Sequence, residues 1–295
     1  MLTNRLLYLF VLVALLVVTA CAPKFDALEI TPISPTSVPP ATAIATIISQ
    51  TVTATVSTDL KGKFEVNGHS LHIECLGTGS PTIVLESGEG GTVREFSQIQ
   101  KKLAELTTTC AYDRANNGQS DKVATPRTAK DVMEDLHALL SAAKVPGPYL
   151  LVGHSAGGMF VQLYARTYPD QVFGVVAMNP VPPAHPWLDQ VGDASEEAYY
   201  RGQNGESLDY LTSSDQIATA PLPPDVPFEM LLSTDIQCEG DQICLKSYST
   251  YEQIMQTVSA SWPSGNFSQV ESGHNIFVED PEAVVTTVER VLSSR

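Results

Sequence analysis

A serine flanked by glycines is the strongest chemical feature of this 295-residue chain. Residues 153–157 read GHSAG, which fits the pattern GxSxG, and they stand between the apolar run YLLVG and a predicted helix over 156–167. At such a strand-turn-helix junction the turn is so sharp that the serine backbone is strained, and a side chain in place of Gly153 or Gly157 would collide with its neighbours. We therefore predict that Ser155 is a nucleophile, with its hydroxyl lifted above a sheet.

A serine hydroxyl needs a base that removes its proton, so a histidine must approach from elsewhere in the chain. His274, within ESGHN, follows the last predicted strand and precedes the last predicted helix, at the sheet edge where the carboxyl ends of strands gather. We assign the base to His274. The other five histidines occupy an opening hairpin, a helix interior, the serine motif itself and the stretch after residue 180: His69, His72, His137, His154 and His185.

Ser155 and His274 would be two members of a catalytic triad. The third member should be a carboxylate that fixes the tautomer of the histidine and stabilises its imidazolium form. The usual order along the chain is serine, acid, histidine. Asp235 lies just past the run FEMLLS and is best placed. Asp241 is the second choice, with Glu239 behind it. Asn179, at the end of the preceding predicted strand, is a further alternative; its amide could orient a histidine but could not offset its charge.

Two backbone N–H groups should stabilise the oxyanion that forms when Ser155 attacks a carbonyl. The first is that of Ala156, at the N-terminus of the following helix, where free N–H groups and the helix dipole favour negative charge. The second should come from the glycine-rich loop SGEGG at 87–91, through the N–H of Glu89 or Gly90. The alternative is that this loop is merely flexible.

Strands and helices alternate along most of the chain. Asn67-Gly68 favours a tight hairpin between strands 63–66 and 70–76. Continuous apolar runs such as YLLVG and VFGVVAM are typical of the buried centre of a parallel sheet, so we predict a mostly parallel sheet with helices on both faces. Further strands are expected over 82–86, 108–113, 149–153, 173–179, 228–233 and 267–271, and helices over 94–106, 128–143, 156–167 and 281–292.

One long irregular connection, over 181–225, contains six prolines among polar and aromatic residues. So long a connection is uncommon without a role. We therefore interpret it as a cap over the edge of the sheet rather than as a plain loop.

The N-terminus has the features of an export signal. Arg5 precedes an apolar run over 6–18, and Val18-Thr19-Ala20-Cys21 resembles the lipobox of bacterial lipoproteins, in which the cysteine is acylated. We predict a signal peptide over 1–21 with Cys21 as lipid anchor, a Ser/Thr/Pro-rich linker over 22–60 and a globular domain over 61–295. An ordinary cleaved signal or a single N-terminal membrane helix is the alternative.

The net charge narrows the classes of molecule that the protein could bind. The formal net charge of −16 weighs against nucleic acid and anionic lipid surfaces as binding partners.

An even number of cysteines after Cys21 permits two disulfides in an exported protein. Their spacing suggests a long-range pair and a short loop: Cys75 with Cys110, and Cys238 with Cys244. A zinc site is disfavoured, because His72 would face away from Cys75 on a strand.

The chain resembles the α/β-hydrolase superfamily from residue 71 to 292. Four runs carry the resemblance: PTIVLESGEGG, CAYDRANNGQSD, YLLVGHSAGGMFVQLYARTYPDQVFGVVAMNP and SGHNIFVEDPE. It implies an eight-stranded sheet with a small cap after the sixth strand, no cofactor and no metal. The family's sheet order would also place the second strand beside the fourth, which supports the pairing of Cys75 with Cys110. Two departures are Asn116, where a glycine is common, and Asn179, where relatives often have aspartate.

These features predict a carboxylesterase-like serine hydrolase that acts outside the cytoplasm on a small-molecule ester, through an acyl-enzyme. The resemblance argues against haloalkane dehalogenases and epoxide hydrolases, which have aspartate at the position of Ser155. A peptidase, a lactonase or a carbon–carbon bond hydrolase with the same triad is the first alternative. A surface binding protein that keeps the scaffold without turnover is the second.

Overall fold

The computed structural model of the chain describes residues 59–235 and 242–295. The chain divides into two units, 1–52 and 53–295, and all described residues belong to the second. The predictions for the signal peptide, for Cys21 and for most of the linker therefore lie outside the described residues. The same holds for Cys238, Glu239 and Asp241. No helix within the described ranges is both long and apolar enough to cross a membrane.

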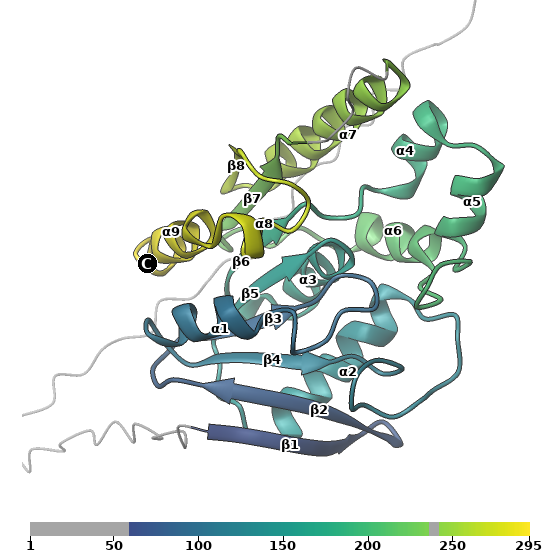
Figure 1. Cartoon of the computed structure of the whole chain (residues 1–295). Coiled ribbons are helices and arrows are strands. Elements are labelled where there is room, and N and C mark those ends of the chain that lie inside the picture. Colours follow the sequence, from purple (N-terminus) through teal and green to yellow (C-terminus); the bar gives the residue numbers. More distant parts are fainter. Residues whose placement is uncertain (1–58, 236–241) are drawn as a thin grey trace, which may run out of the picture. The chain divides into compact units, whose positions relative to one another are not determined.

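A single sheet of eight strands organises the described domain (Figure 1). The strand order is β1-β2-β4-β3-β5-β6-β7-β8; β1 and β4 pair antiparallel with β2, and every later pairing is parallel. This confirms the predicted fold class and the position of the second strand beside the fourth. The strands are β1 Asp59–Val66, β2 His69–Leu76, β3 Thr82–Glu86, β4 Thr109–Asp113, β5 Tyr149–His154, β6 Val172–Met178, β7 Phe228–Ser233 and β8 Gly265–Val270.

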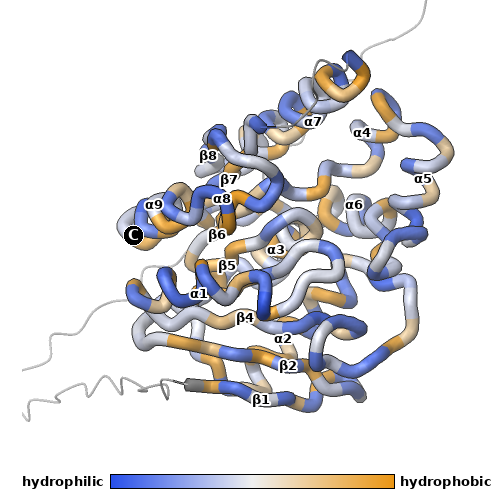
Figure 2. The backbone as a smooth tube through the Cα atoms, in the orientation of Figure 1, coloured by the Kyte–Doolittle hydropathy of each residue, from blue (hydrophilic) through white to orange (hydrophobic). Residues whose placement is uncertain are grey.

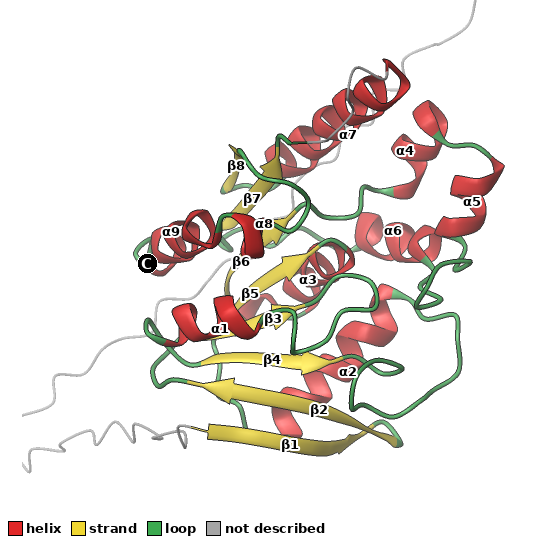
Figure 3. Ribbon diagram, in the orientation of Figure 1, coloured by secondary structure: helices red, strands yellow, loops and turns green. Residues whose placement is uncertain are grey.

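Helices alternate with these strands and cover both faces of the sheet (Figure 3). They are α1 Ser97–Ala104, α2 Ala129–Ala142, α3 Ala156–Thr167, α4 Ala184–Val191, α5 Ala194–Tyr200, α6 Tyr210–Thr219, α7 Gln242–Ser261, α8 Ile276–Glu279 and α9 Pro281–Leu292, with a 3-10 turn over Pro169–Gln171. Thr128 caps α2: its side chain accepts from the Asp131 N–H, and the Asp131 carboxylate accepts from the Thr128 N–H.

The central strands are apolar throughout because they are buried on both faces. Successive side chains point to opposite faces, so Leu151 and Val175 join one apolar cluster, whereas Leu150 and Val176 join the other. The first cluster includes residues of α2 and α3, and the second includes residues of α1, α8 and α9. Strands β1 and β2 instead alternate between hydrophilic and hydrophobic residues (Figure 2). The strands that carry the candidate nucleophile are therefore held from both sides.

The structure differs from the sequence prediction in two element boundaries, in the nature of one long connection and in one additional helix. Strand β1 begins at Asp59, two residues inside the predicted linker, and α1 begins at Ser97 because residues 93–96 form turns. The connection over 181–225 is not irregular: it contains α4, α5 and α6. Helix α7 was not predicted, because its buried side chains include only two large apolar ones, Ile254 and Met255, and so give a weak periodic signal.

The predicted pairing of Cys75 with Cys110 is confirmed. The two cysteines stand directly opposite each other on the antiparallel strands β2 and β4, and a disulfide of 2.05 Å joins them. The neighbouring hairpin is also as predicted, since Asn67 and Gly68 both have positive φ, at 48° and 87°, as its tight turn requires.

Removal of this disulfide should destabilise the domain. We expect C75A/C110A to lower the free energy of unfolding by about 2–4 kcal/mol, because the unfolded chain regains the freedom that the cross-link removes. Urea unfolding followed by circular dichroism measures this loss. Reductant should lower the stability of the wild type more than that of the double variant. Equal stability of wild type and variant under oxidising conditions would contradict the prediction.

Candidate active site

Ser155 occupies a strained turn between β5 and α3. Its backbone has φ 52° and ψ −117°, a conformation that is uncommon for residues other than glycine and costs on the order of 1–3 kcal/mol. The surroundings hold it there: the Ser155 N–H donates to the Met178 carbonyl at 2.9 Å, and the Ser155 carbonyl accepts from the Val181 N–H at 3.1 Å. The β6 end and the chain beyond it therefore fix the serine backbone.

The two glycines of the motif leave no room for a side chain. A Cβ atom on Gly153 would lie 2.4 Å from the Gly157 carbonyl oxygen, and one on Gly157 would lie 2.1 Å from the Glu86 carbonyl oxygen. Both distances are too short for real contacts. The steric reason for glycine at both positions is thus present in the fold.

His274 lies in the loop between β8 and α8, and its backbone is anchored from two sides. Its carbonyl oxygen accepts from Asn179 Nδ2 at 2.8 Å and from His154 Nε2 at 3.0 Å. Its ring lies 4.7 Å from that of His154, and it lines the same cavity as Ser155. Within the described residues, no hydrogen bond joins its imidazole to Ser155 or to a carboxylate.

Asn179 acts on the backbone of the histidine loop and not on the imidazole. Besides its bond to the His274 carbonyl, its Oδ1 accepts from the Ser233 N–H at 2.8 Å. It therefore ties the ends of β6 and β7 to the loop that carries the candidate base. The expectation that it might stand in for the acid is not met by its contacts.

Desolvation by the cavity walls lowers the pKa of His274, and the Glu279 carboxylate partly opposes this shift. Burial lowers the pKa of His154 to about 4, helped by the nearby His274. Both rings are therefore neutral near pH 7. His154 Nε2 must carry its proton, since it donates to a carbonyl. A neutral His274 is the form that can accept a proton.

Two carboxylates lie close to His274. The Asp235 N–H donates to the Ser272 carbonyl at 3.0 Å, and its side chain lines the cavity but forms no hydrogen bond or ion pair within the described residues. Glu279, which sequence reasoning missed, accepts from the Gly273 N–H at 2.7 Å and also lines the cavity. Its position five residues after the histidine, in the short α8, was the available signal.

Of the three predicted oxyanion donors, two remain suitable. Within the described residues, the N–H groups of Ala156 and Glu89 have no acceptor. The prediction for Gly90 was wrong, because its N–H donates to Glu206 Oε2 at 2.7 Å. The loop does reach the motif: a Cβ on Gly88 would lie 3.4 Å from the Ser155 Cβ.

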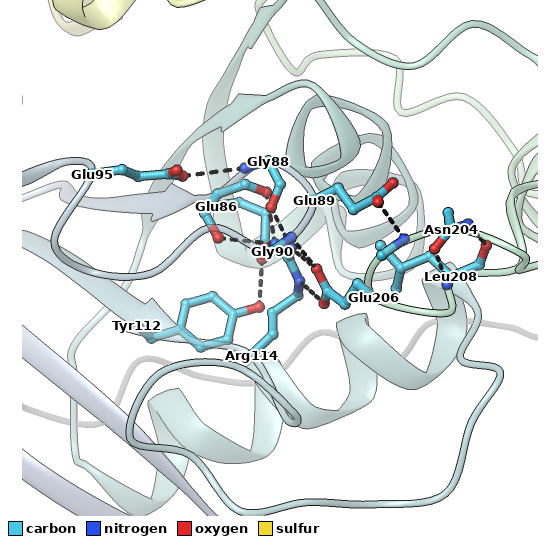
Figure 4. A network of polar contacts seen from close by, with 12 residues as sticks. Glu86, Gly88, Glu89, Gly90, Glu95, Tyr112, Arg114, Asn204, Glu206 and Leu208 are labelled. Atoms are coloured by element: carbon cyan, nitrogen blue, oxygen red, sulfur yellow. Dashed lines mark hydrogen bonds and ion pairs between the residues drawn. The ribbon is translucent and has the colours of Figure 1, made fainter. Parts of the chain in front are cut away.

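A buried arginine holds this loop in place (Figure 4). Arg114 donates to the carbonyl oxygens of Ser87 and Gly88 at 2.6 and 2.5 Å. It also pairs with Glu86 at 2.6 Å and with Glu206 at 2.7 Å, and all three side chains are almost fully buried. Burial raises the pKa of Glu86; for Glu206, burial is outweighed by Arg114, which holds its pKa below the usual value.

The Glu89 side chain joins the same loop to the cap. Its carboxylate accepts from the hydroxyls of Tyr199 and Tyr210 at 2.6 and 3.0 Å, and from the Gly205 N–H at 2.7 Å. Glu206, the partner of Arg114, lies beside Gly205 in the segment between α5 and α6. The cap and the candidate oxyanion loop therefore share one polar network, which the sequence pattern did not reveal.

A cavity of about 570 Å³ opens above the serine. Its floor includes Ser155, Asn179, Ser233 and His274, from the carboxyl ends of the strands and the loops that follow. The cap supplies Trp187, Glu196, Tyr199 and Tyr200 to its walls, and α7 supplies Tyr248 and Tyr251. The predicted cap thus lines the cavity. The remaining histidines lie elsewhere, paired or stacked with other side chains: His69, His72, His137 and His185.

A family model described as the alpha/beta hydrolase fold matches residues 81–203, which include the glycine-rich loop and the serine motif. The sheet order, the turn at Ser155 and this match all indicate the α/β-hydrolase fold. The described domain has the α/β-hydrolase fold, and residues 81–203 match the model of that family. In this fold, the helical cap follows β6 and the loop that carries His274 follows β8.

Similar proteins include an uncharacterized protein, a putative carbamate hydrolase and an esterase of solved structure. The uncharacterized protein YqjL of Bacillus subtilis is 30% identical over 118 residues, which are 40% of this chain and 47% of YqjL. The "Putative carbamate hydrolase RutD" of Caulobacter segnis is 25% identical over 236 residues, 69% of this chain and 88% of RutD. A thermophilic esterase from Thermogutta terrifontis superposes with a TM-score of 0.57 at 18% identity, over 79% of this chain and 98% of the esterase. The chain thus spans less than half the length of YqjL.

Within the described ranges, no group of three or more His, Cys, Asp or Glu side chains is arranged to hold a metal ion. The polar groups on the cavity floor suit acyl chemistry instead. They include the Ser155 hydroxyl and the His274 imidazole, and the Ala156 N–H, which has no acceptor among the described residues, follows Ser155 directly in the chain.

The protonation of His274 can be tested directly. We expect its ring to titrate below 6.5 in an NMR titration, because desolvation disfavours the imidazolium. Glu279→Gln should lower this pKa further, since it removes a charge that favours the imidazolium. Glu282→Gln, on α9 and paired with Lys102, is the matched control and should leave it unchanged. A midpoint above 6.5, or one that Glu279→Gln raises, would refute this electrostatic account.

Proposed function

We propose that the protein is a serine hydrolase that cleaves a carboxylic ester through an acyl-enzyme. The observation that carries the proposal is that Ser155, in its strained turn, and His274 line one cavity. Related proteins named as an esterase and a carbamate hydrolase support hydrolysis of an acyl bond. An ester is the substrate class that we favour, with the solved esterase structure as support.

In the proposed mechanism, His274 takes the proton of the Ser155 hydroxyl as the oxygen attacks the acyl carbon. The N–H groups of Ala156 and Glu89 donate to the developing oxyanion. His274 then gives the proton to the leaving alcohol. Water, deprotonated by the same histidine, releases the acid and restores the serine.

Asp235 is the acid that we propose for the triad. It follows β7, its backbone is bonded to the histidine loop at Ser272, and its carboxylate is uncommitted within the described residues. Asp235 and His274 also line the same cavity. Glu279 is less suited, because the Gly273 N–H already binds one of its oxygens.

We also propose that the reaction takes place outside the cytoplasm, with Cys21 as a lipid anchor. The signal-like N-terminus supports this location, and so does the disulfide between Cys75 and Cys110, since disulfides persist in oxidising compartments. Globomycin treatment of producing cells tests the anchor: it should cause the unprocessed form to accumulate, and Cys21→Ser should abolish labelling by a palmitate analogue.

The nucleophile is tested with a fluorophosphonate probe and a neutral chromogenic ester. Ser155→Ala should abolish labelling and lower kcat by about 10³-fold or more, and His274→Ala should do nearly the same, because the two act as a unit. Ser141→Ala, at an exposed position of α2, is the matched control and should label like the wild type. Absence of labelling and of turnover in the wild type would instead favour a binding protein on this scaffold.

The acid is tested by comparing three isosteric variants. Asp235→Asn should lower kcat on the order of 10³-fold, because an amide cannot stabilise the imidazolium. Glu279→Gln should keep most of the activity, since an amide oxygen can still accept from the Gly273 N–H. Asp241→Asn should be active as well. If Glu279→Gln or Asp241→Asn abolishes turnover while Asp235→Asn is active, the assignment passes to that residue.

A further inference from the structure

The charges and rings that line the cavity are unevenly distributed. Three carboxylates face it, from Glu196, Asp235 and Glu279, and none of them forms an ion pair within the described residues. No Lys or Arg among the described residues lines it. The stretch 236–241, for which the structure gives no description, contains neither Lys nor Arg in its sequence.

The carboxylate of the cap is positioned by a neutral donor. Glu196 Oε2 accepts from Trp187 Nε1 at 3.1 Å, which orients the indole and the carboxylate against each other without cancelling the charge. Both side chains are partly exposed and line the cavity. A fixed negative charge beside the widest aromatic face is a favourable environment for a cation.

The aromatic side chains are anchored by their polar ends. Tyr251 donates to the Pro180 carbonyl at 2.8 Å, Tyr248 to the Ser233 carbonyl at 2.5 Å, and Tyr200 to the Pro182 carbonyl at 3.2 Å. Backbone carbonyls therefore occupy the three hydroxyls, and all three residues line the cavity. Trp187 stands edge-on to Tyr251, with ring centroids 6.3 Å apart.

An aromatic wall with uncompensated carboxylates repels an anionic substrate and attracts a cationic one. The same wall offers ring faces, which bind ammonium groups through the quadrupole of the ring. We propose that the preferred ester carries a positive charge, an ammonium or quaternary ammonium group, which lies against the ring face of Trp187 and beside the Glu196 carboxylate while its acyl carbon faces Ser155. This inference rests on the proposed function, for which it names the substrate class.

Two isosteric thioesters provide the test, acetylthiocholine and 3,3-dimethylbutyl thioacetate, which differ in a quaternary nitrogen or carbon. We expect kcat/KM to be at least about 10-fold higher for the cation, as one desolvated cation–π contact would give. The advantage should shrink as salt is raised, while hydrolysis of the neutral thioester should not change. Equal rates, or faster hydrolysis of the neutral thioester, would overturn the proposal and leave the serine mechanism intact.

Variants show whether the preference for a cation comes from the cavity or from the overall charge of the protein. Glu196→Gln and Trp187→Leu should each lower the ratio of kcat/KM for the cationic thioester to kcat/KM for the neutral thioester by about 3-fold or more. Glu134→Gln, which removes one exposed charge on α2, is the matched control and should leave the advantage unchanged. If Glu134→Gln reduces it as much as Glu196→Gln does, the preference comes from the net charge of −16, and the proposed site is wrong.

A binding measurement separates failure of this inference from failure of the proposed function. Ser155→Ala should bind phenyltrimethylammonium in isothermal titration calorimetry, and Glu196→Gln in the same background should weaken that binding. Binding without turnover of any ester by the wild type would uphold the cation site and refute the hydrolase. Turnover without binding would uphold the hydrolase and refute the cation site.

Discussion

The close approach of α3 to the edge of β3 is the constraint on which the arrangement of the site depends. Gly157 packs so tightly against the Glu86 carbonyl, at the end of β3, that no side chain fits, and the turn at Ser155 that leads into α3 is strained. Such strain persists only where the surroundings over-determine it. Here they do so because β5 is buried along its whole length and α3 is buried over most of its own. The rigid core thus fixes the position of the Ser155 hydroxyl.

A second constraint is the charge of Arg114, which no solvent reaches. A buried ion costs several kcal/mol unless it is paired, and removal of one partner leaves the other uncompensated. Arg114 meets this requirement with carboxylates from two distant segments, Glu86 at the end of β3 and Glu206 in the cap, and with two carbonyls of the glycine-rich loop. The loop that should stabilise the oxyanion and the segment that walls the cavity are consequently parts of one electrostatic unit.

Sequence reasoning recovered the features that local physics determines. Apolar strands, the glycines around Ser155 and the loop before His274 follow from periodicity and steric rules, and all lie where expected. What it missed depends on contacts between distant residues. Gly90 is a plausible oxyanion donor in isolation, but its N–H is taken by a carboxylate 116 residues away. Helix α7 likewise buries few large apolar side chains, so its own sequence does not reveal it.

The floor and the wall of the cavity come from different parts of the chain. This division explains how one scaffold can keep the groups on its floor fixed while the groups on its wall change. The floor is built from strand ends whose geometry the whole sheet enforces, so a change there disturbs the strained turn or the histidine loop. The wall comes from the cap and α7, and α7 contacts the chain ends that form the floor through two tyrosine hydroxyls on backbone carbonyls. Because a carbonyl accepts from any donor, such contacts fix the rings without dictating the neighbouring side chains. The charge of the wall can therefore vary while the reacting groups stay in place, and in this chain that charge is negative.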